Sequence, residues 1–298
     1  MLGVTAAACV STSDLGRAIL RDDLTSSPKP QSLGVNLMDT LNLDWPAGDS
    51  SIGVITLNRP DALNAMNTLM IQELLNLFRE QAYNDGLRCM VLTGAGKRAF
   101  CTGGDLKERN GMSNDQWRVQ HHLIEDAFKA LWEFPVPIIA AVEGFAFAGG
   151  CELALGTDFI VASATAEFAL KEVTRGILPG GGGLQNLARS IGMRRAREMI
   201  YTGRAIDAET ADAWGLVNRV VPAGKALESA VEIARQIADS APMAVRMAKL
   251  STSRGQDTDS ATAYALDIAA YNVLVVSEDR LEGIAAFNEK RKPQWKNR

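Results

Sequence analysis

The chain is organised around residues 138–155, which read IIAAVEGFAFAGGCELAL. The first five residues are apolar and mostly aliphatic, which is typical of a buried strand. Gly149 and Gly150 then precede a helix-forming run, so bare backbone N–H groups stand at the positive end of a helix. Such an end attracts developing negative charge, and Gly149 can approach a ligand closely because it has no Cβ atom. The stretch therefore predicts a strand, a turn and a helix whose start is an oxyanion site.

Two glutamates belong to this region. Glu152 lies in the otherwise small and apolar helical run, where glutamate is rare unless it is paired or functional. A second apolar strand is predicted at 159–162, and Glu172 follows it shortly before the glycine-rich turn 178–183. A glutamate in a first helical turn usually only complements the helix dipole. The co-occurrence of both carboxylates with Gly149 favours a catalytic site instead.

Four stretches together resemble the signature of the crotonase family, the enoyl-CoA hydratases and isomerases. Residues 149–154 and 168–183 match its central motif, 58–66 (NRPDALNAM) its first turn, and 99–108 (AFCTGGDLKE) the loop that carries its other oxyanion donor. The likeness runs from about Ile52 to the C-terminus. Alternating strands and helices by themselves predict only an α/β fold. The resemblance implies a crotonase-like spiral of repeated ββα units with a C-terminal α-helical trimerisation module.

The resemblance also implies a reaction, the hydration of a 2-enoyl-CoA thioester to 3-hydroxyacyl-CoA. The N–H groups of Gly104 and Gly149 would stabilise the enolate oxygen, and such donors contribute roughly 2.7–4 kcal/mol each. Glu152 would hold and activate water, and Glu172 would exchange a proton with the α-carbon. Lys171 stands where the family often has proline, and its cation would lower the pKa of Glu172.

Coenzyme A is part of the substrate, so no separate cofactor is expected. The family assigns a backbone contact with the adenine to Ala62 and a contact with the pantetheine arm to Phe287. It assigns the phosphates to Lys107 and Lys290. No metal is expected, because the four cysteines lack metal-ligand spacing and the two histidines are adjacent.

Composition excludes several other classes of protein. The 298 residues are 47% hydrophobic, enough for a large core. A net charge of −4 argues against a nucleic-acid surface, and no apolar run reaches membrane-spanning length. Reduced cysteines indicate a reducing compartment, so we expect a cytoplasmic protein, with the mitochondrial matrix as the other location.

The sequence divides into three parts. Residues 1–38 predict a loosely ordered extension, 39–223 the spiral core with the active site, and 224–298 a helical module. Further strands are predicted at 41–45, 52–57 and 89–92, and Asn67 is predicted to cap a long helix. The module should contain helices at 226–239, 242–251, 260–276 and 279–290, with Asp279 and Glu282 as a capping pair.

The module also predicts self-association. Residues 263–274 carry more apolar positions than one packing stripe needs, so a partner subunit is expected to cover them. The family resemblance implies a homotrimer or homohexamer, with the last helix reaching over the neighbour's CoA site.

Two alternatives stay open. An enoyl-CoA isomerase would move the double bond with one carboxylate. Residues 100–112 and 179–183 also resemble relatives that are hydratases and bind RNA, although 107–110 supply only two cations in an acidic chain. Both alternatives keep the same fold.

Overall fold

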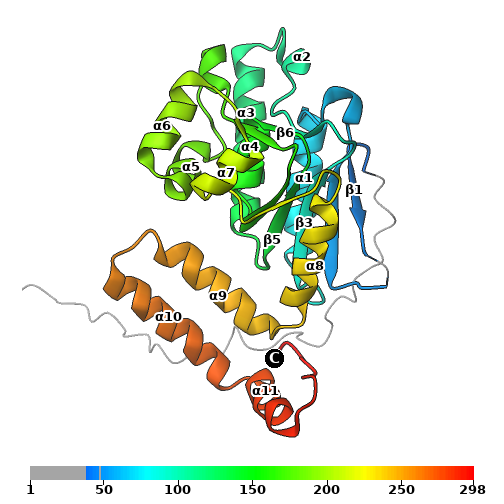
Figure 1. Cartoon of the computed structure of the whole chain (residues 1–298), viewed down its shortest axis with the longest axis vertical. Helices are drawn as coiled ribbons and strands as arrows, with labels where there is room; N and C mark the ends of the chain where they lie inside the picture. The colour runs from blue at the N-terminus through cyan, green and yellow to red at the C-terminus, as the bar shows by residue number, and fades with distance from the viewer. Residues whose placement is uncertain (1–37, 47) are drawn as a thin grey trace, which may run out of the picture. The chain divides into compact units, whose positions relative to one another are not determined.

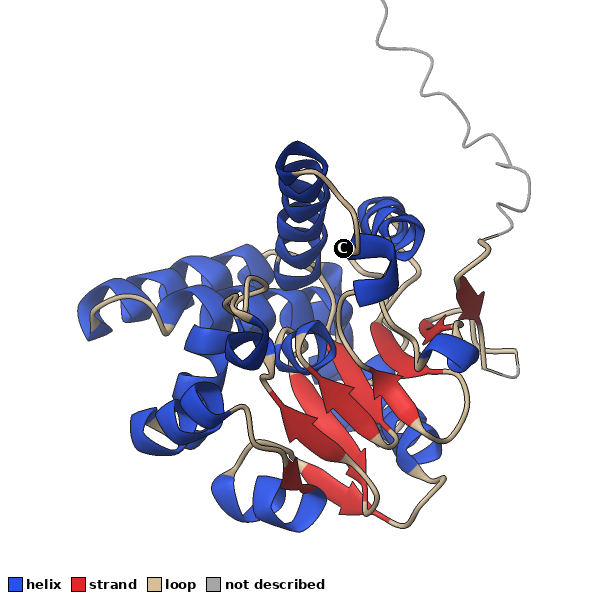
Figure 2. Cartoon of the chain, turned by 90° about the horizontal axis from the view of Figure 1, so that it is seen from above, coloured by secondary structure: helices blue, strands red, loops and turns tan. Residues whose placement is uncertain are grey.

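A six-stranded sheet forms the centre of the computed structural model, which describes residues 38–46 and 48–298 (Figure 1, Figure 2). In order across the sheet the strands are β1 (Leu41–Asp44), β2 (Ile52–Leu57), β3 (Cys89–Gly94), β5 (Ile138–Val142), β7 (Phe159–Ser163) and β10 (Arg219–Val221). Only β1 runs antiparallel to its neighbour. The five strands predicted from the sequence are confirmed, and β5 is buried along its whole length.

A second sheet of four short strands lies in the order β4 (Ala99–Cys101), β6 (Phe145–Phe147), β8 (Glu167–Ala169) and β9 (Ile206–Asp207). Each of β3, β5 and β7 leads into a short strand of this sheet and then into a helical segment. That alternation is the ββα repeat, so the predicted α/β spiral is confirmed. It places the starts of successive helices beside one another, where the site lies.

Helices cover both faces of the large sheet. On one face, α1 (Thr68–Gln81) packs against α3 (Asn114–Trp132), and the core there includes Leu74, Phe78 and Phe128. The predicted cap of α1 is confirmed, because the Asn67 side chain accepts a hydrogen bond from the Met70 N–H at 3.0 Å. On the other face lies α8 (Ala226–Ala238), so the first helix of the predicted module also covers the sheet.

The remaining helical segments of the core are short. They are η1 (Pro60–Ala62), α2 (Leu106–Arg109), α4 (Gly149–Leu155), η2 (Glu172–Arg175), α5 (Gly183–Ile191), α6 (Met193–Thr202) and α7 (Ala208–Trp214). Close packing of α4 on β4 requires a glycine, because a Cβ atom on Gly150 would lie 2.0 Å from the carbonyl oxygen of Cys101. This contact holds the helix that carries Glu152 against the strand that leads to Gly104.

The C-terminal helices are α9 (Pro242–Gly255), α10 (Ser260–Val275) and α11 (Glu278–Glu289). Their predicted positions are confirmed, but the predicted capping pair is wrong. Ser277 is the N-cap of α11 and accepts from the Arg280 N–H at 3.1 Å. Asp279 instead accepts from the N–H groups of Lys296 and Asn297, and Glu282 binds Arg291. The chain end, 9 to 18 residues further along, takes both carboxylates.

α10 exposes much of its apolar surface. Of the residues described in this helix, Ala270 alone is buried, and the exposed large apolar side chains are Tyr264, Ile268, Tyr271, Val273 and Val275. Among the described helices, none alone has the length and apolar content to cross a membrane; the pair α10 and α11, bent by 75°, meets those two criteria together.

Apart from Met38, the predicted extension 1–38 lies outside the described residues.

Candidate active site

A cavity of about 1110 Å³ lies between α2, α3, α4 and the loop 177–181. Six of the eight residues assigned to the site from the sequence line it: Ala62, Gly104, Lys107, Gly149, Glu152 and Glu172. Phe287 and Lys290 do not. They lie at the end of α11, far from α4 in Figure 1, and Phe287 is 83% exposed. The cavity therefore combines every predicted catalytic group with part of the predicted CoA site.

Gly104 and Gly149, the two glycines predicted to supply oxyanion donors, both line this cavity. A Cβ atom on Gly149 would lie 3.8 Å from the Gly104 nitrogen, so the two loops touch. Within the described part of the chain, neither N–H donates a hydrogen bond to another protein group. Ala148, which precedes Gly149, has a φ of 50°, a conformation that is strained for a residue with a Cβ atom. This strained turn stands directly before α4 and therefore before the Gly149 N–H.

The loop of Gly104 is held by an ion pair that the sequence analysis did not identify. Arg59 Nη1 lies 2.9 Å from Asp105 Oδ2 and also donates to the Ala65 carbonyl at 2.6 Å. Asp105 caps α2 by accepting from the Lys107 N–H at 3.0 Å. Burial raises the pKa of Asp105, but the Arg59 hydrogen bond and the backbone donors outweigh it and hold this pKa below its usual value. Arg59 belongs to the quoted motif 58–66, whose spacing alone does not reveal its partner.

Glu152 projects from α4 and is only 4% exposed. Its Oε1 accepts from the N–H groups of Gly181 at 2.8 Å and Gly183 at 2.9 Å, at the start of α5. Burial raises the pKa of Glu152 from 4.5 to about 7, and the nearby charge of Glu172 adds to this, while the glycine donors oppose it. A carboxyl group with this pKa can give or take a proton near neutrality.

Glu172 begins η2 and is 6% exposed. Its Oε2 is buried and has no hydrogen-bond partner among the described residues. Burial raises the pKa of Glu172, opposed by its own backbone N–H and by the charge of Arg175. The expectation that Lys171 lowers this pKa is wrong, because the Lys171 ammonium lies 4.7 Å from the centre of the Phe147 ring and donates to the Gly203 carbonyl. Glu172 is thus a second buried carboxyl group whose pKa lies above its ordinary value.

The raised pKa of Glu152 predicts how stability depends on pH. The folded protein binds the proton of Glu152 more tightly than the unfolded chain does, so this proton stabilises the fold. The contribution is fully present below the pKa of the unfolded chain and is lost as the pH rises through about 7. In Glu152→Gln this loss of stability with rising pH should be absent, because the amide at position 152 does not ionise. Between about pH 5 and about pH 8, we expect the free energy of unfolding to shift by roughly 3 kcal/mol in favour of the variant.

Urea unfolding of both proteins across this pH range measures the shift. Glu167→Gln, on β8 and outside the cavity, is the matched control and should follow the wild type. Parallel stability curves for Glu152→Gln and the wild type would contradict a raised pKa at this position.

Comparisons with known proteins show the family of the chain. The family described as enoyl-CoA hydratase/isomerase matches residues 47–298. A short-chain-enoyl-CoA hydratase of Clostridium acetobutylicum is 39% identical over 251 residues, 84% of this chain and 96% of that protein. The enoyl-CoA hydratase domain-containing protein 2, mitochondrial, of Homo sapiens is 39% identical over 251 residues, 83% of this chain and 86% of that protein. The crystal structure of an enoyl-CoA hydratase from Bacillus anthracis has a TM-score of 0.85 at 41% identity, and the match covers 87% of this chain and 100% of that one. The chain therefore belongs to the enoyl-CoA hydratase/isomerase family, the crotonase family.

Proposed function

We propose that the protein is an enoyl-CoA hydratase, which adds water across the 2,3 double bond of a 2-enoyl-CoA thioester. The observation that carries the proposal is that two buried carboxyl groups, Glu152 and Glu172, share one cavity with two unengaged glycine N–H groups of the described chain. Hydration needs a base for water, an acid for the α-carbon and donors for the thioester oxygen. An isomerase needs only one carboxylate, so the pair favours hydration.

In the proposed reaction, Glu152 takes a proton from water while the water oxygen bonds to C3. The electron pair of the double bond moves through C2 to the thioester oxygen, where the N–H groups of Gly104 and Gly149 stabilise the negative charge. Glu172, protonated, then gives its proton to C2 and the enolate collapses to the thioester. The two hydrogen bonds to Glu152 Oε1 keep its carboxylate in place throughout. A proton passing from Glu152 to Glu172 restores the starting state.

An assay of the purified protein tests the reaction. The conjugated double bond of a 2-enoyl-CoA absorbs in the ultraviolet, and hydration removes that absorbance. A 3-enoyl-CoA substrate distinguishes an isomerase from a hydratase, because an isomerase would raise the absorbance by forming the conjugated double bond. Loss of absorbance with 2-enoyl substrates, together with oxygen-18 from labelled water in the product, is the expected result. Turnover of the 3-enoyl substrate alone would favour the isomerase.

Ala62 and Lys107 are the proposed CoA contacts within one subunit, since both line the cavity. Phe287 and Lys290 would complete the site of a neighbouring subunit through α11. No metal or redox cofactor takes part in the proposed reaction, and CoA enters with the substrate. The relatives are bacterial proteins and a protein named as mitochondrial, so we propose a location in the cytoplasm or the mitochondrial matrix.

The exposed apolar side chains of α10 and α11 support assembly into a homotrimer or homohexamer. Ile268 and Tyr271 on α10 and Leu281, Ile284 and Phe287 on α11 are all exposed in the single chain. Burial of such a surface against another subunit is favourable. Light scattering should report three or six times the chain mass of 32.0 kDa. A fully active monomer would contradict both the assembly and the shared CoA site.

A further inference from the structure

Arg109 places a cation in the active-site cavity that the proposed reaction does not use. It ends α2, and its guanidinium lies against Gly104: a Cβ atom on Gly104 would be 2.8 Å from Arg109 Nη1. Arg59, in the same cavity, is paired with Asp105. Among the described residues, no carboxylate lies within ion-pair distance of Arg109. Lys107, Lys171 and Arg175 also line the cavity, and Arg109 is the cation among these four that lies against Gly104.

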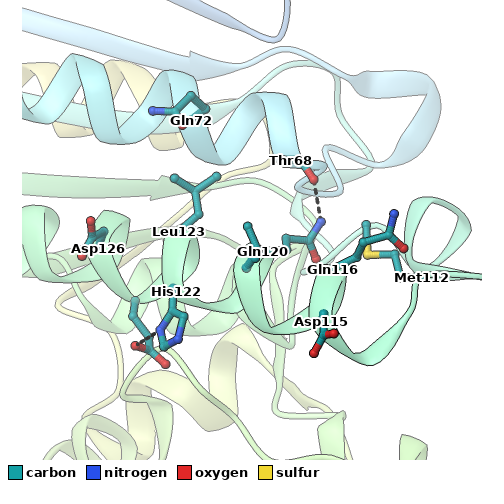
Figure 3. Close-up of a pocket in the computed structure, with 11 residues that line it drawn as sticks. Thr68, Gln72, Met112, Asp115, Gln116, Gln120, His122, Leu123 and Asp126 are labelled. Carbon is teal, nitrogen blue, oxygen red and sulfur yellow. Dashed lines mark hydrogen bonds and ion pairs between the residues drawn. The ribbon is translucent and has the colours of Figure 1, made fainter.

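The guanidinium is held in a defined orientation. Arg109 Nε donates to Gln120 Oε1 at 2.7 Å, and Arg109 Cζ lies 4.6 Å from the centre of the Trp117 ring. The Gln120 amide donates in turn to Thr68 Oγ1 at 2.8 Å and to Glu108 Oε2 at 2.9 Å. Figure 3 shows the bond to Thr68, in a neighbouring cavity of about 940 Å³ lined by α1 and α3. Because all the polar atoms of the buried Gln120 side chain are engaged, its carbonyl must face Arg109.

One edge of the guanidinium remains available. Its Nε edge is bound by Gln120 and one face is covered by Trp117, while Nη1 and Nη2 donate to no group in the described part of the chain. A planar guanidinium held in this way matches the two oxygens of a carboxylate. Apolar side chains, among them Trp117, Ile124 and Phe128, line the same cavity. An apolar acyl chain packed there would desolvate the cation without compensation.

From this geometry we infer that Arg109 selects substrates whose acyl chain carries a carboxylate, so that the preferred substrate is an enoyl-CoA of a dicarboxylic acid. The inference rests on the proposed function for the orientation of the substrate. Gly104 would bind the thioester oxygen, and Arg109 lies against Gly104. The carboxylate that Arg109 recognises therefore lies a short distance from the thioester along the acyl chain of the substrate.

Calorimetric binding of two saturated thioesters tests the inference without requiring turnover. Glutaryl-CoA and pentanoyl-CoA have the same number of acyl carbons and differ in the terminal carboxylate. The wild type should bind glutaryl-CoA more tightly. Arg109→Met should weaken glutaryl-CoA binding by roughly 10- to 100-fold and leave pentanoyl-CoA binding unchanged or stronger. Arg109→Lys keeps the charge but cannot form two parallel hydrogen bonds with a carboxylate. Its affinity for glutaryl-CoA should lie between those of the wild type and Arg109→Met.

Arg118→Met, on the exposed side of α3 where Arg118 pairs with Asp115, is the matched control and should change neither affinity. Equal binding of the two thioesters by the wild type overturns the inference without any variant. Equal weakening of both ligands in Arg109→Met also overturns it, since that result assigns Arg109 to the structure of the loop. Failure to hydrate any enoyl-CoA would instead reject the proposed function, and the binding preference would still be measured.

Discussion

Replacing either active-site carboxylate with its amide is expected to reduce hydration by roughly 10²- to 10⁴-fold. Glu152→Gln and Glu172→Gln keep the size of each side chain, and the amide oxygen introduced at position 152 could still accept the hydrogen bonds of Gly181 and Gly183. Each variant loses a group that exchanges protons. Because the two carboxyl groups act in one reaction, the double variant should be little worse than the poorer single variant.

Steady-state kinetics with a 2-enoyl-CoA, alongside thermal melting, measures these effects. Glu167→Gln lies outside the cavity on β8 and should keep wild-type turnover. Near-normal hydration by either single variant would reject the mechanism with two carboxylates. If only one of the two single variants lost activity, and the activity lost was turnover of a 3-enoyl substrate, an isomerase with one carboxylate would be the better assignment.

Gly183→Ala is expected to reduce turnover by about 10²-fold although it removes no catalytic group. A Cβ atom on Gly183 would lie 2.8 Å from Glu152 Cγ and 2.9 Å from Glu152 Oε1, too close for either side chain to remain in place. Glu152 lies in the tightly packed α4, so its carboxylate must rotate away from the Gly181 and Gly183 N–H groups. Displacement of a catalytic group by about 1 Å is enough for an effect of this size.

The loss should appear in kcat more than in KM, because Gly183 itself does not line the cavity. Gly86→Ala is the control: Gly86 is exposed, and a Cβ atom there would meet only the Asn84 side chain at 3.4 Å among the described residues. It should leave both activity and melting temperature near the wild-type values. Wild-type kcat in Gly183→Ala would show that the position of Glu152 does not depend on the start of α5.

Local features were predictable where neighbouring residues decide them. Apolar periodicity located the strands of the large sheet, and the Asn67 side chain marked the start of α1, because both depend on residues within a few positions. The capping pair proposed for α11 failed for the opposite reason. The carboxylates of Asp279 and Glu282 are taken by the chain end at 291–297, which no local pattern indicates.

The sequence by itself determined the family, the fold class and the residue types of the site, since Gly104, Gly149, Glu152 and Glu172 all lie in recognisable motifs. Only the tertiary structure decided the burial, the hydrogen bonds and the pKa values of those residues. Burial raises the pKa of Glu152 although the N–H groups of Gly181 and Gly183 oppose the rise, and α3 supplies the Gln120 that orients Arg109. Desolvation and hydrogen bonding depend on distances between segments that are far apart in the chain, and those distances exist only once the spiral has closed around the cavity.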